Sequence, residues 1–152
     1  MKLRIKKLRN WAKLPVRAHR TDAGMDLFYC PPSDRILFED VDIKPFHSTL
    51  LPSGIAIEIP PNFMAEVKNK SGIASNKSLV VGACVCDPNY SGEIMVNLHN
   101  IGHETQWIEP GQKIAQLVFV EIETDIELVE SEEIYDAPTE RAEGGFGSTG
   151  EK

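Results

Sequence analysis

The sequence lacks several features, and each absence argues against a class of protein. It contains only three cysteines, Cys30, Cys84 and Cys86, and this odd, low number argues against a disulfide framework and for a reducing compartment. No run approaches the roughly 18 apolar residues of a membrane-spanning helix. Lysine and arginine number 16 against 23 acidic residues, which gives a net charge of −7. We therefore expect neither membrane association nor direct binding to DNA.

The N-terminal twenty residues are basic but contain no apolar segment of the kind found in secretory signals. We therefore expect a cytoplasmic protein, or one acting in the cytoplasm of a host cell if its source is a virus. The composition is that of a globular chain until about Ile134 and then becomes rich in glycine. We expect a folded core over residues 1–134 and a flexible C-terminal arm over 135–152.

Short apolar runs, several with the alternation typical of strands, are separated by turns rich in proline and glycine. The expected strands lie within residues 35–40, 48–60, 62–69, 78–87, 93–100, 112–123 and 126–134. Residues 71–78 form the single expected helix, a short one that Ser71 could cap. This pattern predicts an all-β sandwich or barrel.

The segment VCDPNYSGEIM, residues 85–95, is expected to be a hairpin with Asp87 at its mouth. A carboxylate in that place can accept a proton from water, and the ring of Tyr90 can lie against a ligand. The alternative is that Asp87 caps a turn and Tyr90 lies at its rim. This segment alone leaves both interpretations open.

Three further positions are candidates for a site. Lys70 and Ser71 lie where a strand gives way to the helix, a place suited to an anion but also to a plain helix cap. Asp26 follows Gly24 and could hold a metal-bound water or close a turn. Gln116, on an apolar strand, is either a buried, satisfied amide or a donor to a ligand.

The terminal GGFGSTG could cradle phosphates, because glycine allows backbone N–H groups to approach phosphate oxygens. A flexible tail is the alternative, although its central phenylalanine is unusual for a linker.

Together and in order, these segments resemble the five motifs of the homotrimeric deoxyuridine triphosphatases (dUTPases). The motifs are AGMDL (23–27), KSGIA (70–74), GACVCDPNYSGEI (82–94), GQKIAQ (111–116) and RAEGGFGSTG (141–150). The resemblance implies a distorted β-barrel or jelly roll with one short helix. It also implies hydrolysis of dUTP to dUMP and pyrophosphate, which limits uracil incorporation into DNA and supplies dUMP for dTTP synthesis.

The resemblance further implies a Mg²⁺ ion on the triphosphate, a homotrimer with shared active sites, and a C-terminal arm that closes over a neighbouring site. Asp87 matches the residue that activates water, and Asp26 matches the acid that holds the metal through water. The remaining positions match substrate-binding residues: Lys70, Ser71, Gly72, Gly82, Ala83, Cys84, Tyr90, Met95, Gln116, Arg141, Phe146, Gly147, Ser148 and Thr149.

Two departures from the family pattern concern the site. Lys70 stands where arginine is usual. This replaces a guanidinium, which can donate two parallel hydrogen bonds to a phosphate, by the single compact charge of an ammonium group. Cys84 stands where glycine is common, so its side chain either points away from the base or narrows the pocket. Two other functions remain alternatives: a dCTP deaminase or bifunctional enzyme of the same fold, and a nucleotide-binding regulatory module that contacts a protein partner.

Overall fold

The computed structural model describes residues 2–32, 40–135 and 137–140. Within them, short strands make up four small sheets in which every strand pairing is antiparallel. The strands are β1 (Ile5–Lys7), β2 (Met25–Phe28), β3 (Val41–Ile43), β4 (Ser48–Pro52), β5 (Ile55–Ile57), β6 (Phe63–Lys68), β7 (Leu79–Val81), β8 (Val85–Cys86), β9 (Met95–Asn100), β10 (Gln106–Ile108) and β11 (Lys113–Glu121).

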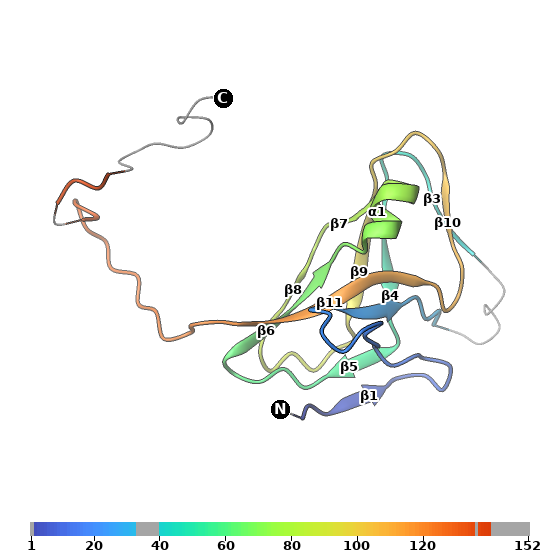
Figure 1. The fold of residues 1–152 in the computed structure, drawn as a ribbon, viewed down its shortest axis with the longest axis horizontal. Coiled ribbons are helices and arrows are strands. Elements are labelled where there is room, and N and C mark those ends of the chain that lie inside the picture. Colours follow the sequence, from blue (N-terminus) through green and yellow to red (C-terminus); the bar gives the residue numbers. More distant parts are fainter. Residues whose placement is uncertain (1, 33–39, 136, 141–152) are drawn as a thin grey trace.

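The largest sheet has the strand order β2-β11-β6-β8, and the next has the order β4-β9-β7. Two-stranded ribbons, β1-β5 and β10-β3, complete the fold (Figure 1). The described sheets do not close into one continuous barrel. The predicted all-β architecture with one short helix is confirmed.

The longer strands form because their side chains alternate between the core and the outside. In β9, Val96, Leu98 and Asn100 are buried, whereas the residues between them are partly or fully exposed. In β11, Ile114, Ala115 and Leu117 are buried near the start of the strand, where a register shift against β2 interrupts the alternation. The apolar residues among them belong to one core to which strands of all four sheets contribute.

The structure differs from the expected strands in three ways. Residues 126–134 contain no strand, and β11 is the last one in the described chain. Two expected strands are divided: 48–60 into β4 and β5, with Gly54 between them at φ +77°, and 78–87 into β7 and β8, which belong to different sheets. Strands β2, β3 and β10 were not expected, whereas most of the expected strand at 35–40 lies outside the described residues.

The helix α1 (Ser71–Lys77) is one residue shorter than expected. Lys70, not Ser71, occupies its N-cap position, with an extended backbone and no side-chain capping hydrogen bond. The expected Ser71 cap is therefore wrong, because Ser71 is already the first helical residue. The helix ends at Ser78, whose left-handed backbone has φ 52°.

The expected hairpin over residues 85–95 does not form. Strand β8 pairs with β6, whereas β9 pairs with β4 and β7. Residues 87–94 therefore connect the largest sheet to the three-stranded sheet. Asp87 begins this connection instead of closing a hairpin.

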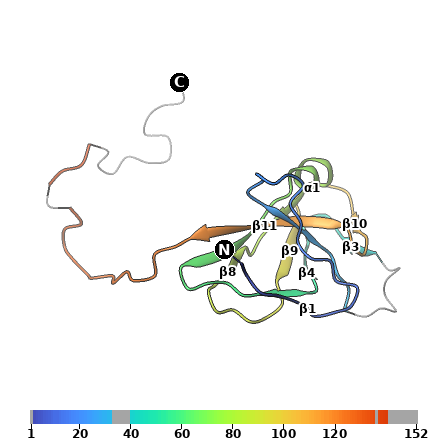
Figure 2. The ribbon, with the colours of Figure 1, turned by 60° about the horizontal axis from the view of Figure 1, so that its bottom comes forward.

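The chain leaves the sheets after β11, as both views show (Figures 1 and 2). Residues 123–135 are exposed and include the large apolar side chains of Ile126, Leu128 and Val129. In the described part of the chain, the helix is too short and too polar to cross a membrane.

Candidate functional site

A cavity of about 290 Å³ lies beside the connection between β8 and β9. Its lining includes Asp87, Tyr90 and Met95, three of the predicted site residues. Ala83 and Cys84 contribute a further part of the wall. The structure thus brings together the predicted catalytic carboxylate, the predicted sugar-contacting ring and the predicted base-reading segment.

Asp87 is exposed, and its carbonyl oxygen accepts a hydrogen bond from the N–H of Tyr90 at 3.2 Å. Tyr90 donates its hydroxyl to the carbonyl oxygen of Glu93 at 3.1 Å. The ring passes so close to Gly92 that a Cβ atom there would lie 2.3 Å from the tyrosine oxygen. Glycine at this position therefore gives the ring room to lie along its own loop.

Cys84 and Cys86 both line this cavity, and both are free thiols. Cys84 also lines the smaller neighbouring hollow that includes Gly82, so it lies between the two. Its carbonyl oxygen accepts a hydrogen bond from the N–H of Val67 at 2.8 Å, which fixes the segment against β6. Burial raises the pKa of the Cys86 thiol, and the nearby charge of Asp87 adds to the increase.

A second group of predicted residues surrounds Asp26 on β2. This carboxylate is 6% exposed and forms ion pairs with two lysines: Lys70 Nζ lies 2.8 Å from Oδ1, and Lys113 Nζ lies 2.7 Å from Oδ2. Asp26 is a strand residue whose N–H donates to the carbonyl oxygen of Val16, so it does not close an Asx turn.

Burial by itself would raise the pKa of Asp26, but the hydrogen bonds and charges of Lys113 and Lys70 outweigh it and hold the pKa below its usual value. Each carboxylate oxygen already faces an ammonium group, and two such charges oppose the approach of a divalent cation. The described residues therefore do not fit a Mg²⁺ ion at Asp26, and they contain no cluster of three or more metal-binding side chains.

Gln116 connects this group to the segment before the helix. Its Nε2 donates to the carbonyl oxygen of Asn69 at 2.8 Å. A Cβ atom on Gly24 would lie 2.1 Å from Gln116 Oε1, so glycine in AGMDL leaves the space that the amide occupies. In this structure the amide is half-buried, and its hydrogen bond to Asn69 holds the residue beside Lys70 in place.

Comparison with known proteins decides the family. The family model described as dUTPase matches residues 10–150. The chain belongs to the dUTPase family. Deoxyuridine 5′-triphosphate nucleotidohydrolases from a Hydrogenobaculum species and from Clostridium kluyveri are 40% and 41% identical to it, over 100% and 99% of both chains.

Solved dUTPases have the same fold. The dUTPase of Staphylococcus bacteriophage 80alpha with dUpNHpp superimposes with a TM-score of 0.85 at 30% identity, over 98% of both chains. A dUTPase from phage phi11, described with a structural Mg(II) ion, has a TM-score of 0.78 at 26% identity and covers 90% of this chain and 100% of its own. The predicted distorted jelly roll is confirmed by these likenesses.

Two further predicted site residues of this dUTPase, Gly82 and Gly72, do not line the cavity around Asp87. Gly82 lines a smaller hollow that also includes Cys84 and Asn69. Gly72, in α1, has open space where a Cβ atom would lie. The tail positions lie outside the described residues: Arg141, Phe146, Gly147, Ser148 and Thr149.

Five cavity residues were not predicted: Leu50, Val67, Val85, Cys86 and Glu93. Leu50 comes from β4 and Val67 from β6, so only strand pairing brings them to the cavity. Glu93 follows Tyr90 by three residues, and an acidic residue so close to a candidate sugar-binding ring is a signal that the sequence does offer.

Proposed function

We propose that this dUTPase hydrolyses dUTP to dUMP and pyrophosphate, and so limits uracil incorporation into DNA and supplies dUMP for dTTP synthesis. The observation that carries the proposal is the cavity in which Asp87 and Tyr90 lie together with Met95 and Cys84. One wall offers a carboxylate, another offers a flat ring, and a strand-like segment offers main-chain groups. This set suits a nucleotide with a small pyrimidine base.

Asp87 is the proposed general base. It lies at the edge of the cavity, is exposed to solvent and can orient a water molecule toward the α-phosphorus. As the water oxygen bonds to phosphorus, the carboxylate takes the proton and the bond to pyrophosphate breaks.

Tyr90 is proposed to lie under the deoxyribose, and main-chain groups of residues 82–84 and of Met95 to read the uracil. A ribose 2′-hydroxyl against the apolar face of the ring would lose its hydrogen-bond partners on burial, which costs about 1–3 kcal/mol. Backbone N–H and C=O groups recur at fixed spacing along an extended segment, so they can match the edge of one base.

Lys70, Ser71, Gly72 and Gln116 are proposed to contact the phosphates, together with the tail residues Arg141, Phe146, Gly147, Ser148 and Thr149. Because two lysines already neutralise Asp26, Mg²⁺ is better supplied on the triphosphate than held by that carboxylate. When bound there, the ion neutralises phosphate charge. Asp26 then acts by holding Lys70 in place.

The predicted site residues form two groups, one around the cavity and one around Asp26. We propose that a homotrimer brings the groups of different subunits together and that residues 135–152 of one subunit close over a neighbouring site. The cytoplasm, cellular or of a host cell, is the proposed place of action, because the similar enzymes come from bacteria and phages. Sedimentation equilibrium tests the trimer directly.

Pyrophosphate release with dUTP, dCTP, dTTP and UTP, each with and without Mg²⁺, tests the function. We expect release with dUTP only, at a higher rate with Mg²⁺. Conversion of dCTP to a deaminated product would instead favour the deaminase. Tight nucleotide binding without turnover would favour a regulatory module.

A further inference from the structure

Packing holds Tyr90 only in part. The residue is 44% exposed, and it lines two hollows at once: the candidate cavity and a larger hollow of about 350 Å³ beside β1 and β5. The hydrogen bond from its hydroxyl to the carbonyl oxygen of Glu93 is therefore a main constraint on the ring. The position of Tyr90 depends on the position of residue 93.

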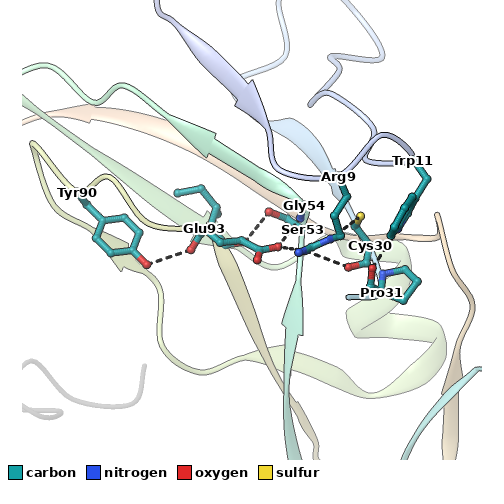
Figure 3. Close-up of polar contacts among 9 residues, drawn as sticks. Arg9, Trp11, Cys30, Pro31, Ser53, Gly54, Tyr90 and Glu93 are labelled. Carbon is teal, nitrogen blue, oxygen red and sulfur yellow. Dashed lines mark hydrogen bonds and ion pairs between the residues drawn. The ribbon is translucent and has the colours of Figure 1, made fainter. Parts of the chain in front are cut away.

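Glu93 is held from its other side, as Figure 3 shows. Its Oε1 accepts a hydrogen bond from the N–H of Gly54 at 2.6 Å and forms an ion pair with the guanidinium of Arg9. The side chains of Arg9 and Glu93 are only 15% and 20% exposed. Water screens such a pair much less than it screens a pair on the open surface.

Arg9 is itself fixed by the chain that follows β2. Its Nε donates to Cys30 Sγ at 3.3 Å and its Nη2 donates to the carbonyl oxygen of Cys30 at 3.3 Å. One planar guanidinium thus joins the N-terminal segment, the end of β2 and the loop that carries Tyr90 (Figure 3). A lysine could not make all these contacts, because it presents a single ammonium group.

Glu93 and Tyr90 are both among the residues that line the cavity. Arg9 and the N–H of Gly54 both contact Oε1 of Glu93, whereas the main-chain carbonyl of Glu93 accepts the hydroxyl of Tyr90. The Arg9–Glu93 pair therefore helps to set where the Tyr90 ring lies at the proposed sugar site.

We infer that Arg9 is a positioning residue for sugar discrimination: by engaging the Glu93 carboxylate, it fixes the loop that carries Tyr90. This inference rests on the proposed function, in which Tyr90 lies under the sugar. It assigns a role in substrate selection to a residue that lies 84 positions before Glu93 in the chain.

The test compares kcat/KM for dUTP with kcat/KM for UTP in Arg9→Met, Arg9→Lys and Arg9→Met/Glu93→Met. We expect the ratio to fall on the order of tenfold in Arg9→Met, because a ring that is no longer held in place excludes the 2′-hydroxyl less well. The double variant should be about as unselective as Arg9→Met, because Arg9 acts through its contact with Glu93, which is already lost in the single variant. Arg9→Lys should lie between the wild type and Arg9→Met.

Arg4→Met is the matched control, because Arg4 also pairs with a glutamate, Glu58, but on the open surface. It should leave the ratio unchanged. A merely structural role for Arg9 would lower the melting temperature and both kcat/KM values without changing their ratio.

An unchanged ratio in Arg9→Met, or a double variant much less selective than Arg9→Met, would overturn the inference. If Arg9→Met does not fold, an unchanged ratio in Arg9→Lys overturns it. Failure of the wild type to release pyrophosphate from dUTP is a separate result, which would reject the proposed function itself.

Discussion

Two aspartates of this dUTPase lie in opposite environments. Asp87 is exposed at the edge of a cavity, at the start of a connection between two sheets. Asp26 is buried on a central strand, between two lysines. The same side chain can thus serve chemistry in one place and architecture in the other, because solvent access decides whether a carboxylate can exchange a proton with water.

The largest expected effect comes from Asp87→Asn. Removing the proposed base should lower kcat for dUTP by about 10²–10⁴-fold, while dUTP still binds, because only proton acceptance is lost. Pyrophosphate release measures turnover, and titration calorimetry with a non-hydrolysable dUTP analogue measures binding. Asp42→Asn, at an exposed position on β3, is the matched control and should behave as the wild type. Normal turnover of Asp87→Asn would remove Asp87 from the mechanism.

Deleting residues 141–152 tests whether turnover requires the C-terminal arm to close over the cavity. We expect about a 10²-fold loss of kcat/KM, because the proposed contacts to uracil and phosphate are removed and water is less well excluded. The truncated protein should fold, since every described strand ends at or before Glu121. Circular dichroism and sedimentation check the fold and the assembly. A truncated chain that fails to fold would contradict the proposed role of the arm.

Asp26→Asn makes the same chemical change at the buried position and should affect stability more than turnover. Two ammonium groups would lose their counter-charge, although they are 33% and 45% exposed and can be partly hydrated. We expect a loss of about 1–3 kcal/mol in the free energy of unfolding at pH 7, measured by urea denaturation.

The pH dependence of stability gives this prediction a definite sign. The folded-state pKa of Asp26 is lowered, so its contribution to stability is present above the unfolded pKa of about 3.9 and is lost as the pH falls through the lower folded value. The wild type and Asp26→Asn should therefore differ at pH 7 and converge in strong acid. A constant difference across this range would show that the ion pairs are not its source.

The sequence predicted those parts of the fold that carry a local pattern. Strands β6, β9 and β11 are long enough to show alternation, and the turns around them contain proline or glycine. Strands β3 and β10 have three residues each and pair with each other across a long stretch of chain, so no local period marks them. The expected hairpin at 85–95 is wrong for the same reason, because strand partners are chosen by nonlocal packing.

The residues of the candidate site divide in the same way, into those that a local motif predicts and those that depend on contacts between distant parts of the chain. Asp87 and Tyr90 were predicted because they lie close together in a distinctive motif, and the structure places both at one cavity. The pairing of Asp26 with Lys113 and the contact of Arg9 with Glu93 join residues distant in the chain. No spacing in a single sequence encodes such pairs, since the partners meet only after the sheets have formed.

The smallest expected effect is that of Lys70→Arg, which restores the residue usual in the family. A guanidinium can donate to Asp26 Oδ1 and still present a second N–H to phosphate, whereas the Lys70 ammonium is a compact point charge. We expect kcat/KM for dUTP to be unchanged or raised by less than about tenfold, the effect of one added charge-assisted hydrogen bond. Lys68→Arg, on the adjoining strand and paired with Glu66, is the control and should change nothing. A large loss in Lys70→Arg alone would mean that the geometry around Asp26 is adapted to two lysines, so that the buried carboxylate and the phosphate site are more tightly coupled than proposed.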